Sequence, residues 1–315
     1  MRPIIVIGSL NMDLVVQAER TPLAGETLAA RTFTTIPGGK GANQAVAAAR
    51  LASGGAVRMV GRVGEDAFGA QLTHNLAAEG IDTAEVRQLP GVSTGVALII
   101  VEPSGENRIL IVAGANGQLP PADIAALDGL IASAGLVLLQ FEVPMPTVER
   151  AIQAANAHNV PVLLNPAPAY PLPAAALAGV DILVLNEVEA QMLTGLPVSD
   201  EHSALNAARR LLAGRTRLVV VTLGTKGALA LAPDAALHVP AFAVQAVDST
   251  AAGDAFIGAL AAMLNDGKGL EESVTFASAA GALAVTRVGA QSSIPNRQEV
   301  NTFLNAHHVR VKTLV

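Results

Sequence analysis

The sequence predicts an α/β protein with a doubly wound, mainly parallel sheet flanked by helices, together with a small β-sheet lid. Short apolar segments alternate with Ala-rich helical segments through most of the 315 residues, which is the pattern of βαβ units. Two regions, at about 13–35 and 94–112, interrupt this alternation with β-prone residues and turn signals. We therefore expect one α/β domain over residues 1–315, with a discontinuous lid contributed by these two regions.

The individual elements follow from runs of apolar residues and from helical periodicity. The clearest core strands are predicted at 4–7, 137–139, 162–164, 182–185 and 218–222. Helices are predicted at 42–50, 68–79, 147–158, 187–193, 203–212, 254–264 and 270–286. The many Ala residues in these helices satisfy helix propensity and add no chemistry. In the second lid region, the sequence Glu102-Pro103-Ser104-Gly105 is a turn signal.

Composition argues against several classes of protein. The net charge is −6, and the 20 Lys and Arg residues form no run, so a nucleic-acid partner is not expected. The chain has no Cys, which excludes disulfides, thiolate catalysis and Cys-ligated metals. No apolar run approaches the roughly 18 to 20 residues that a membrane span needs. We expect a soluble cytoplasmic protein that does not bind a membrane.

The first candidate site residues, Asn11 and Asp13, come soon after the strand predicted at 4–7. Ligands collect beyond the carboxyl ends of strands in open α/β sheets. An Asn and an Asp two positions apart in extended chain can present both side chains to a polyol. An Asx turn that ends the strand is the alternative interpretation.

A glycine-rich loop from Pro37 to Gln44 opens the next helix. Its glycines permit a substrate to lie against main-chain amides at the start of the helix. The loop is neither a P-loop nor a dinucleotide fingerprint, because Lys40 is followed by Gly41 and the third residue after Gly41 is Gln44. An ordinary strand-to-helix connection is the alternative.

The strongest candidate is the stretch that begins at Asp248 and enters a helix of small residues. Ala251, Ala252 and Gly253 leave several amides unobstructed at a helix N-terminus, where an anion such as a transferred phosphoryl group is stabilised. Asp254, next to these amides, is placed to accept a proton from an attacking hydroxyl. In the alternative, Asp248 is an ordinary cap and Asp254 complements the helix dipole.

Two further stretches indicate a nucleotide or metal site only when they are taken together with the three motifs above. The loop from Thr222 to Gly227 follows a buried strand and could hold a nucleotide, or it could be a β-turn. Glu189 suits Mg²⁺ bound through water, or it could be an acidic residue at a helix start. The six His residues contain no H-E-x-x-H pair, so a His-ligated zinc site is not expected.

Taken in order, these motifs resemble the ribokinase family, also called the phosphofructokinase-B family of carbohydrate kinases. The stretches G-S-L-N-M-D and P-G-G-K-G-A-N-Q are similar to its sugar-binding segment, and D-S-T-A-A-G-D-A-F is similar to its C-terminal signature. Between them come G-R-V-G-E-D-A-F-G, S-T-G-V-A-L-I, G-A-N, Q-F-E-V-P, L-N-P-A-P, L-N-E-V-E and V-T-L-G-T-K-G. The resemblance extends from about residue 4 to residue 303.

The resemblance implies ATP-dependent phosphorylation of D-ribose at O5, with Asp254 as general base and the amides of 251–253 as an anion hole. Alternative acceptors are 2-deoxyribose, a nucleoside or a hexose phosphate. The chain offers no obvious Arg cluster for a sugar phosphate, and its one Tyr and seven Phe give little to stack a nucleoside base. A non-catalytic sugar-binding protein is a further alternative, because fold alone does not separate it from an enzyme.

The resemblance also implies the residues of each site. Substrate contacts are expected from Asn11, Asp13, Gly38, Gly39, Lys40, Asn43, Glu142 and Asp254. Nucleotide contacts are expected from Asn186, Thr222, Gly224, Thr225, Lys226, Gly227, Gly253 and Ser278, the last of which stands where some members have a His near the adenine. An activating K⁺ is expected at Asp248, Thr250, Ala284, Arg287, Gly289 and Ser293, and Mg²⁺ through water at Glu189. A homodimer that pairs its lids is expected as well.

Overall fold

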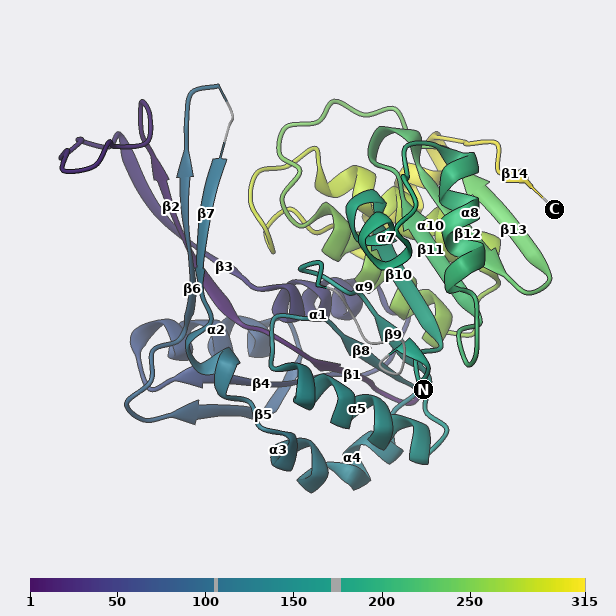
Figure 1. The fold of residues 1–315 in the computed structure, drawn as a ribbon, viewed down its shortest axis with the longest axis horizontal. Helices are drawn as coiled ribbons and strands as arrows, with labels where there is room; N and C mark the ends of the chain where they lie inside the picture. Colours follow the sequence, from purple (N-terminus) through teal and green to yellow (C-terminus); the bar gives the residue numbers. More distant parts are fainter. Residues whose placement is uncertain (105–106, 171–176, 315) are drawn as a thin grey trace.

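The structure is a computed structural model, and it describes residues 1–104, 107–170 and 177–314. In these ranges the strands form a large sheet and a small sheet (Figure 1). The order in the large sheet is β14-β13-β12-β11-β10-β9-β8-β1-β4-β5. Its strands are β1 (Ile4–Ile7), β4 (Val57–Gly64), β5 (Asp82–Leu89), β8 (Leu136–Leu139), β9 (Val162–Leu164), β10 (Ile182–Asn186), β11 (Leu218–Thr222), β12 (Ala228–Ala232), β13 (Ala235–Val239) and β14 (Lys312–Thr313).

Helices cover both faces of the large sheet (Figure 1). Because side chains alternate along a strand, Ile4 and Val6 of β1 pack into one core while Ile5 and Ile7 pack into the other. The first core is covered by α1 (Lys40–Leu51), α2 (Ala67–Ala78), α9 (Ala252–Asn265), α10 (Leu270–Ala284) and α11 (Arg297–Ala306). The second is covered by α3 (Pro121–Ala126), α4 (Asp128–Ala132), α5 (Met145–Ala157), α7 (Glu187–Thr194) and α8 (Glu201–Leu211). None of the helices in the described ranges is long and apolar enough to cross a bilayer.

The strand order reverses direction at β1. On one side of β1 the chain adds β4 and then β5, and on the other side it adds β8, β9, β10 and β11, all in parallel. A reversal of this kind leaves a crevice beyond the carboxyl ends of the strands, because the following connections diverge to opposite sides. The fold therefore offers a binding position at the carboxyl end of β1.

The small sheet stands away from the body of the molecule (Figure 1). It has the order β3-β2-β6-β7, in which β2 pairs antiparallel with β3 and parallel with β6. Its strands are β2 (Asn11–Gln17), β3 (Thr32–Gly38), β6 (Gly95–Val101) and β7 (Asn107–Val112). Only three residues separate the end of β1 from the start of β2, so the chain passes almost directly from the large sheet into the small one.

Helices α1 and α9 lie close together because one glycine separates their backbones. A Cβ added at Gly258 would lie 2.3 Å from the Cβ of Ala47 and 2.8 Å from the backbone nitrogen of Ala48. Any larger residue at this point would push the helices apart, since interiors are close-packed and tolerate little extra volume. Both helices begin at the carboxyl edge of the sheet, so this contact also brings their N-terminal turns together.

The predicted fold class is confirmed. Every predicted helix overlaps an observed one, and the boundaries differ by two residues or fewer. The small sheet begins two residues before the first predicted lid region and extends three residues beyond it, while residues 105–106 of the second region, including the predicted turn residue Gly105, lie outside the described residues. The interpretation of this sheet as a lid on a single domain stays a prediction.

Candidate functional site

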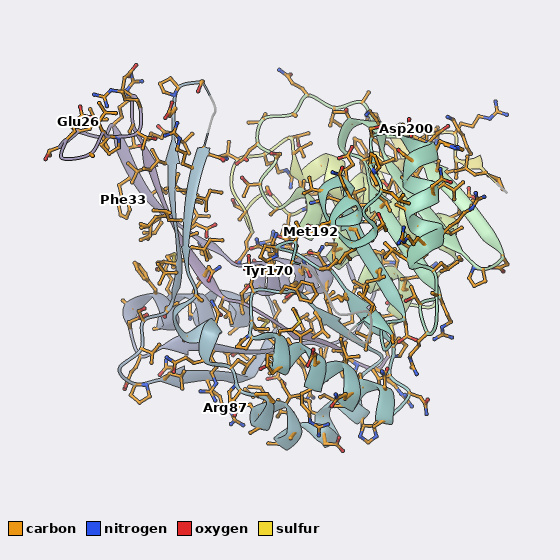
Figure 2. All side chains as sticks on the ribbon, in the orientation of Figure 1. Glu26, Phe33, Arg87, Tyr170, Met192 and Asp200 are labelled. Atoms are coloured by element: carbon orange, nitrogen blue, oxygen red, sulfur yellow. The ribbon has the colours of Figure 1, made fainter. Side chains whose placement is uncertain are left out.

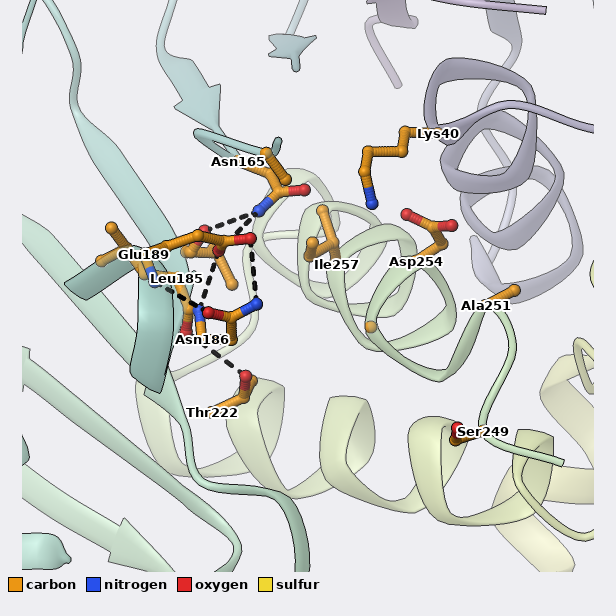
Figure 3. A pocket seen from close by; sticks show the side chains of 13 residues that line it. Lys40, Asn165, Leu185, Asn186, Glu189, Thr222, Ser249, Ala251, Asp254 and Ile257 are labelled. Atoms are coloured by element: carbon orange, nitrogen blue, oxygen red, sulfur yellow. Dashed lines mark hydrogen bonds between the residues drawn. The ribbon is translucent and has the colours of Figure 1, made fainter. Parts of the chain in front are cut away.

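A cavity of about 210 Å³ opens at the carboxyl edge of the large sheet, beside the start of α9 (Figure 3). The ends of β9, β10 and β11 form one wall, and the first turns of α1 and α9 form the other. The lining residues are Lys40, Asn165, Ala167, Val184, Leu185, Asn186, Glu189, Thr222, Ser249, Ala251, Gly253, Asp254 and Ile257. Five of these were predicted from the sequence to contact sugar, nucleotide or both, namely Lys40, Asn186, Thr222, Gly253 and Asp254.

Asp254 is the carboxylate at the centre of this wall, and only 7% of it is exposed. The Nδ2 of Asn43 donates to its Oδ2 at 3.0 Å, and the Nε2 of Gln44 donates to its Oδ1 at 2.9 Å. The ammonium group of Lys40 points toward the same carboxylate (Figure 3), and the charge of Asp254 raises the pKa of Lys40. Two amides and one cation therefore stabilise a carboxylate that burial alone would disfavour.

The N-terminus of α9 is open toward the cavity. Its N-cap, Ala251, has a φ of 57°, and no side chain caps the helix. The amide of Ala252 donates weakly to the carbonyl of Ser249 at 3.3 Å. A Cβ added at Gly253 would meet no atom within 4 Å, so empty space lies directly beside this residue. An uncapped N-terminus that faces a cavity is suited to bind an anion.

Glu142 joins the glycine-rich loop to the segment that follows β1. Its Oε2 accepts a hydrogen bond from the Ser9 hydroxyl at 2.5 Å and another from the Lys40 amide at 3.1 Å. Position 39 requires glycine for two reasons. Its φ is 89°, which other residues rarely adopt, and a Cβ there would lie 2.7 Å from the backbone nitrogen of Asn11. The loop therefore brings the predicted sugar residues of α1 against those of β2.

Asn11 is held by an asparagine from another segment. The Nδ2 of Asn116 donates to the Oδ1 of Asn11 at 2.7 Å, while the Oδ1 of Asn116 accepts from the backbone amide of Leu10 at 2.9 Å. Since the oxygen of the Asn11 amide accepts this bond, its Nδ2 is the group left to donate to a ligand. The Oδ1 of Asn43, by contrast, is buried and has no partner among the described residues.

Asp13 follows on β2 and lies against the glycine loop. A Cβ added at Gly38 would be 2.5 Å from the Oδ2 of Asp13, so only glycine leaves room for this carboxyl. Burial, and then the negative charges of Glu142 and Asp254, raise the pKa of Asp13 from 3.8 to about 7. The three carboxyl groups therefore face one region, where they can accept several hydroxyl hydrogen bonds.

Asn186 and Glu189 occupy the opposite wall. They form a capping box at the start of α7, in which the Asn186 side chain accepts from the Glu189 amide and the Glu189 carboxylate accepts from the Asn186 amide. The predicted alternative for Glu189, an acidic residue that serves a helix start, is therefore present in the structure. Its carboxylate also lines the cavity, and burial raises its pKa. Both functions are compatible, since a carboxylate has several lone pairs.

Some predicted nucleotide residues do not line this cavity. Gly224, Thr225, Lys226, Gly227 and Ser278 are absent from its lining. The loop turns away from the cavity after Thr222, and the Nζ of Lys226 donates to the carbonyl of Ser199 instead. Ser278 is on α10, and its hydroxyl is buried without a partner among the described residues. A nucleotide contact from any of them stays a prediction.

The predicted K⁺ residues come from the loop before α9, from the last residue of α10 and from the loop after α10. Asp248 ties the two loops together. The Oδ2 of Asp248 accepts from the Gly289 amide at 2.9 Å, and its Oδ1 accepts from the amide and hydroxyl of Thr250. Partial burial acts to raise the pKa of Asp248, but these hydrogen bonds outweigh it and hold the pKa below its ordinary value. An ionised carboxylate among loop carbonyls is a donor set that suits a hard cation. In the described part of the chain, no group of three or more His, Cys, Asp or Glu side chains is arranged to hold a metal.

Four polar residues of the site were not singled out from the sequence. Ser9, Gln44, Asn116 and Asn165 each make a hydrogen bond to a predicted site residue or to another member of this group. All four are within the quoted motifs, in the stretches G-S-L-N-M-D, P-G-G-K-G-A-N-Q, G-A-N and L-N-P-A-P. Their position in these motifs is the signal that could have identified them.

Comparisons with known proteins agree with this geometry. A family model described as pfkB family carbohydrate kinase matches residues 1–297. A ribokinase of Schizosaccharomyces pombe is 43% identical over 310 residues, which cover 96% of this chain and 98% of the relative. A deoxyribokinase of Salmonella typhi is 42% identical over 303 residues, which cover 96% of this chain and 98% of that relative. The solved structure of Arabidopsis thaliana ribokinase with ribose and ATP is 36% identical, covers 96% of this chain and 98% of that one, and has a TM-score of 0.89.

The raised pKa of Asp13 predicts a pH dependence of stability that an Asp13→Asn variant removes. The folded state holds this proton up to about pH 7, whereas the unfolded chain releases it near pH 4. The stabilisation that the bound proton provides is therefore complete below about pH 4 and is lost as the pH rises to about 7. Relative to wild type, Asp13→Asn should gain stability over this range by up to about 4 kcal/mol.

Urea denaturation of both proteins at several pH values between 4 and 8, without ligand, measures this difference. Asp234→Asn, at an exposed turn between β12 and β13, is the matched control for the loss of one carboxyl group. A difference between Asp13→Asn and wild type that does not change with pH would show that the Asp13 carboxyl is not perturbed in the folded protein.

Proposed function

This chain belongs to the pfkB family of carbohydrate kinases, and we propose that it transfers the γ-phosphoryl group of ATP to the O5 hydroxyl of D-ribose. The products are D-ribose 5-phosphate and ADP. We propose a cytoplasmic location as well, which the demand for ATP and the absence of Cys favour. The similarity to a deoxyribokinase makes 2-deoxyribose the second candidate acceptor.

The placement of Asp254 is the observation on which this proposal depends. Its carboxylate is buried at the first turn of α9, directly beside an uncapped helix N-terminus that faces a cavity. A protein that only bound sugar would not need a carboxylate beside a helix N-terminus that attracts anions. The carboxylate and an anion bound at that N-terminus repel each other. A general base next to a phosphoryl group explains the arrangement.

The sugar is held between β2 and the glycine loop. Asn11 donates through its Nδ2, and Asp13 and Glu142 accept hydroxyl hydrogens. These contacts direct the O5 hydroxyl toward Asp254. The carboxylate of Asp254 then accepts the hydroxyl proton while the O5 oxygen attacks the γ-phosphorus, and the bond from that phosphorus to the bridging oxygen of ADP breaks.

The N-terminus of α9 supports the negative charge that develops during the transfer. The amides of Ala251, Ala252 and Gly253 lie at the helix start and would face the transferred group, with the dipole of a 14-residue helix behind them. Closure of the small sheet over the sugar would exclude water and suppress hydrolysis of ATP.

Two cations complete the proposal. Glu189, whose buried carboxylate faces the cavity beside Asn165, would hold Mg²⁺ through water, and the ion supplies neutralisation of phosphate charge when bound. K⁺ would be held by Asp248 with oxygens of Thr250, Ala284, Arg287, Gly289 and Ser293, and it supplies rigidity to the loop that precedes α9.

We also propose that the protein is a homodimer paired through its small sheets. The edge strand β7 is exposed along its whole length and carries Ile109, Leu110, Ile111 and Val112, which are 51%, 68%, 56% and 48% exposed. Phe33 adds a further exposed apolar side chain on β3 (Figure 2). An open edge with this many apolar residues invites pairing, and a second copy of the same sheet would cover it.

A panel of acceptors tests the reaction. We expect ADP release with Mg·ATP to be fastest with D-ribose, slower with 2-deoxy-D-ribose, and weak with D-fructose and adenosine. Each rate should rise when K⁺ replaces Na⁺ in the buffer, because the ion orders the loop before α9. A preference for 2-deoxyribose would reassign the acceptor, and equal rates in K⁺ and Na⁺ would remove the cation site.

An Asp254→Asn variant tests the base. The amide keeps the size of the side chain but cannot accept the hydroxyl proton, so we expect turnover to fall by roughly 10² to 10⁴. Sugar affinity, measured by calorimetry, should change far less. Near-normal turnover in this variant would refute the assignment of Asp254.

A Leu110→Asp variant tests the dimer. The new charge on β7 would have to be buried in the paired sheets, which is costly, so we expect the variant to sediment as a monomer where wild type sediments as a dimer. Val188→Asp, at a 66% exposed position on α7, is the matched control and should leave the dimer intact. A monomeric wild type at micromolar concentration would contradict the proposal.

A further inference from the structure

Gln44 is a fully buried amide that lies between α1 and α9. Its Nε2 donates to the Oδ1 of Asp254 at 2.9 Å and to the Oδ1 of Asn165 at 3.2 Å. Its Oε1 accepts from the Nε2 of Gln140 at 2.6 Å. Both hydrogens of the amide nitrogen are therefore used, and one of them goes to the carboxylate that we propose as the general base.

The neighbours of Gln44 fix which way its amide faces. Asn165 donates through its Nδ2 to the carbonyl of Val184 at 3.1 Å, so its Oδ1 is the atom that faces Gln44. An amide nitrogen is thus required on the side of Asn165 and Asp254, where both partners are acceptors. If the amide were reversed, its oxygen would face two other oxygens. The network leaves Gln44 a single orientation, in which it must donate to Asp254.

Gln44 differs in one respect from Asn43, the other amide that donates to Asp254. Asn43 has an unpartnered Oδ1 and is expected to contact the sugar, whereas Gln44 has no exposed surface and its donors and acceptor are all paired within the protein. An effect of Gln44 on the reaction must therefore pass through Asp254.

The charges around Asp254 show why such a donor is needed. Asp13 from β2, Glu142 after β8 and Glu189 from α7 are carboxyl groups that interact with the same site, and Lys40 from α1 is the cation that faces it. Carboxylates close to one another disfavour ionisation, while a hydrogen bond to a carboxylate favours it. A buried donor of fixed orientation acts on the carboxylate at every stage of the reaction, with or without sugar.

We propose that Gln44 is a positioning residue, which fixes the orientation of the Asp254 carboxylate and stabilises the ionised form that accepts the proton. The inference rests on the proposed role of Asp254 as base and goes beyond it. Helix α1, which carries predicted sugar residues, would then have a second function, because it also orients the proton acceptor Asp254.

A pair of methionine variants tests the inference. Gln44→Met keeps the length of the side chain and removes the donor to Asp254. We expect turnover at saturating ribose and ATP to fall by about 10- to 100-fold with little change in either KM, because a misplaced reacting group is costly while binding contacts remain. The acidic limb of the turnover profile should move to higher pH by about one unit, since the carboxylate loses a donor that favours its charged form.

Gln140→Met is the matched control. It removes a buried amide from the same network, but it leaves both hydrogen bonds to Asp254 in place. We expect a comparable loss of stability and an acidic limb at the wild-type pH. If Gln44→Met and Gln140→Met alter the pH profile alike, or if neither moves it, Gln44 has only a structural role and the inference is wrong.

Gln44→Glu provides a second test in case the methionine variant does not fold. It is nearly isosteric, and it places a carboxyl group against Asp254. Because two carboxylates in contact cannot both ionise easily, the acidic limb should move to higher pH. An unmoved limb in the folded Gln44→Glu variant would overturn the inference. Failure of the base itself is distinguished by Asp254→Asn, since an active Asp254→Asn enzyme refutes the base whatever the Gln44 variants do.

Discussion

The close approach of α1 and α9 at Gly258 is the constraint on which the rest of the site depends. Gly258 lies one helical turn after Asp254, on the same face of α9, and its missing side chain lets that face lie against Ala47 and Ala48 of α1. The spacing that packs the core therefore also sets the distance from Asp254 to Gln44. The packing of the two helices therefore sets where the reacting side chains can lie, and the side-chain hydrogen bonds then fix their orientation.

Much of this arrangement could be predicted from the sequence, because the signals were local. Apolar runs predicted five strands of the large sheet, though not β4 or β5, and helical periodicity predicted seven of the helices. Positions just after a strand predicted Asn11 and Asp13 as candidate site residues. The antiparallel strands β12 and β13 were not predicted. Their sequences, A-L-A-L-A and A-A-L-H-V, are rich in a residue that favours helices, and they form strands because β11 offers an edge on which they pair.

The buried amides could not be predicted for a different reason. A glutamine in the first turns of a helix gives no sign of its partner, and the partner of Gln44 is 210 residues away in the chain. Asn116 is likewise 105 residues from Asn11. Such contacts depend on the side of the sheet to which each connection turns, which is decided by tertiary packing. Local patterns identify residues that are able to do chemistry, whereas the residues that orient them become visible only in three dimensions.

The same long separations have a consequence for how the protein acquires activity as it folds. Asn43 and Asp254 are 211 residues apart, and Ser9 and Glu142 are 133 residues apart, so loops of great length must close before the site exists. A chain that has formed only its N-terminal half contains the sugar residues but no proton acceptor. Recovery of turnover during refolding therefore reports the docking of α9 onto α1, and it should lag behind the recovery of helical signal, which requires only local order.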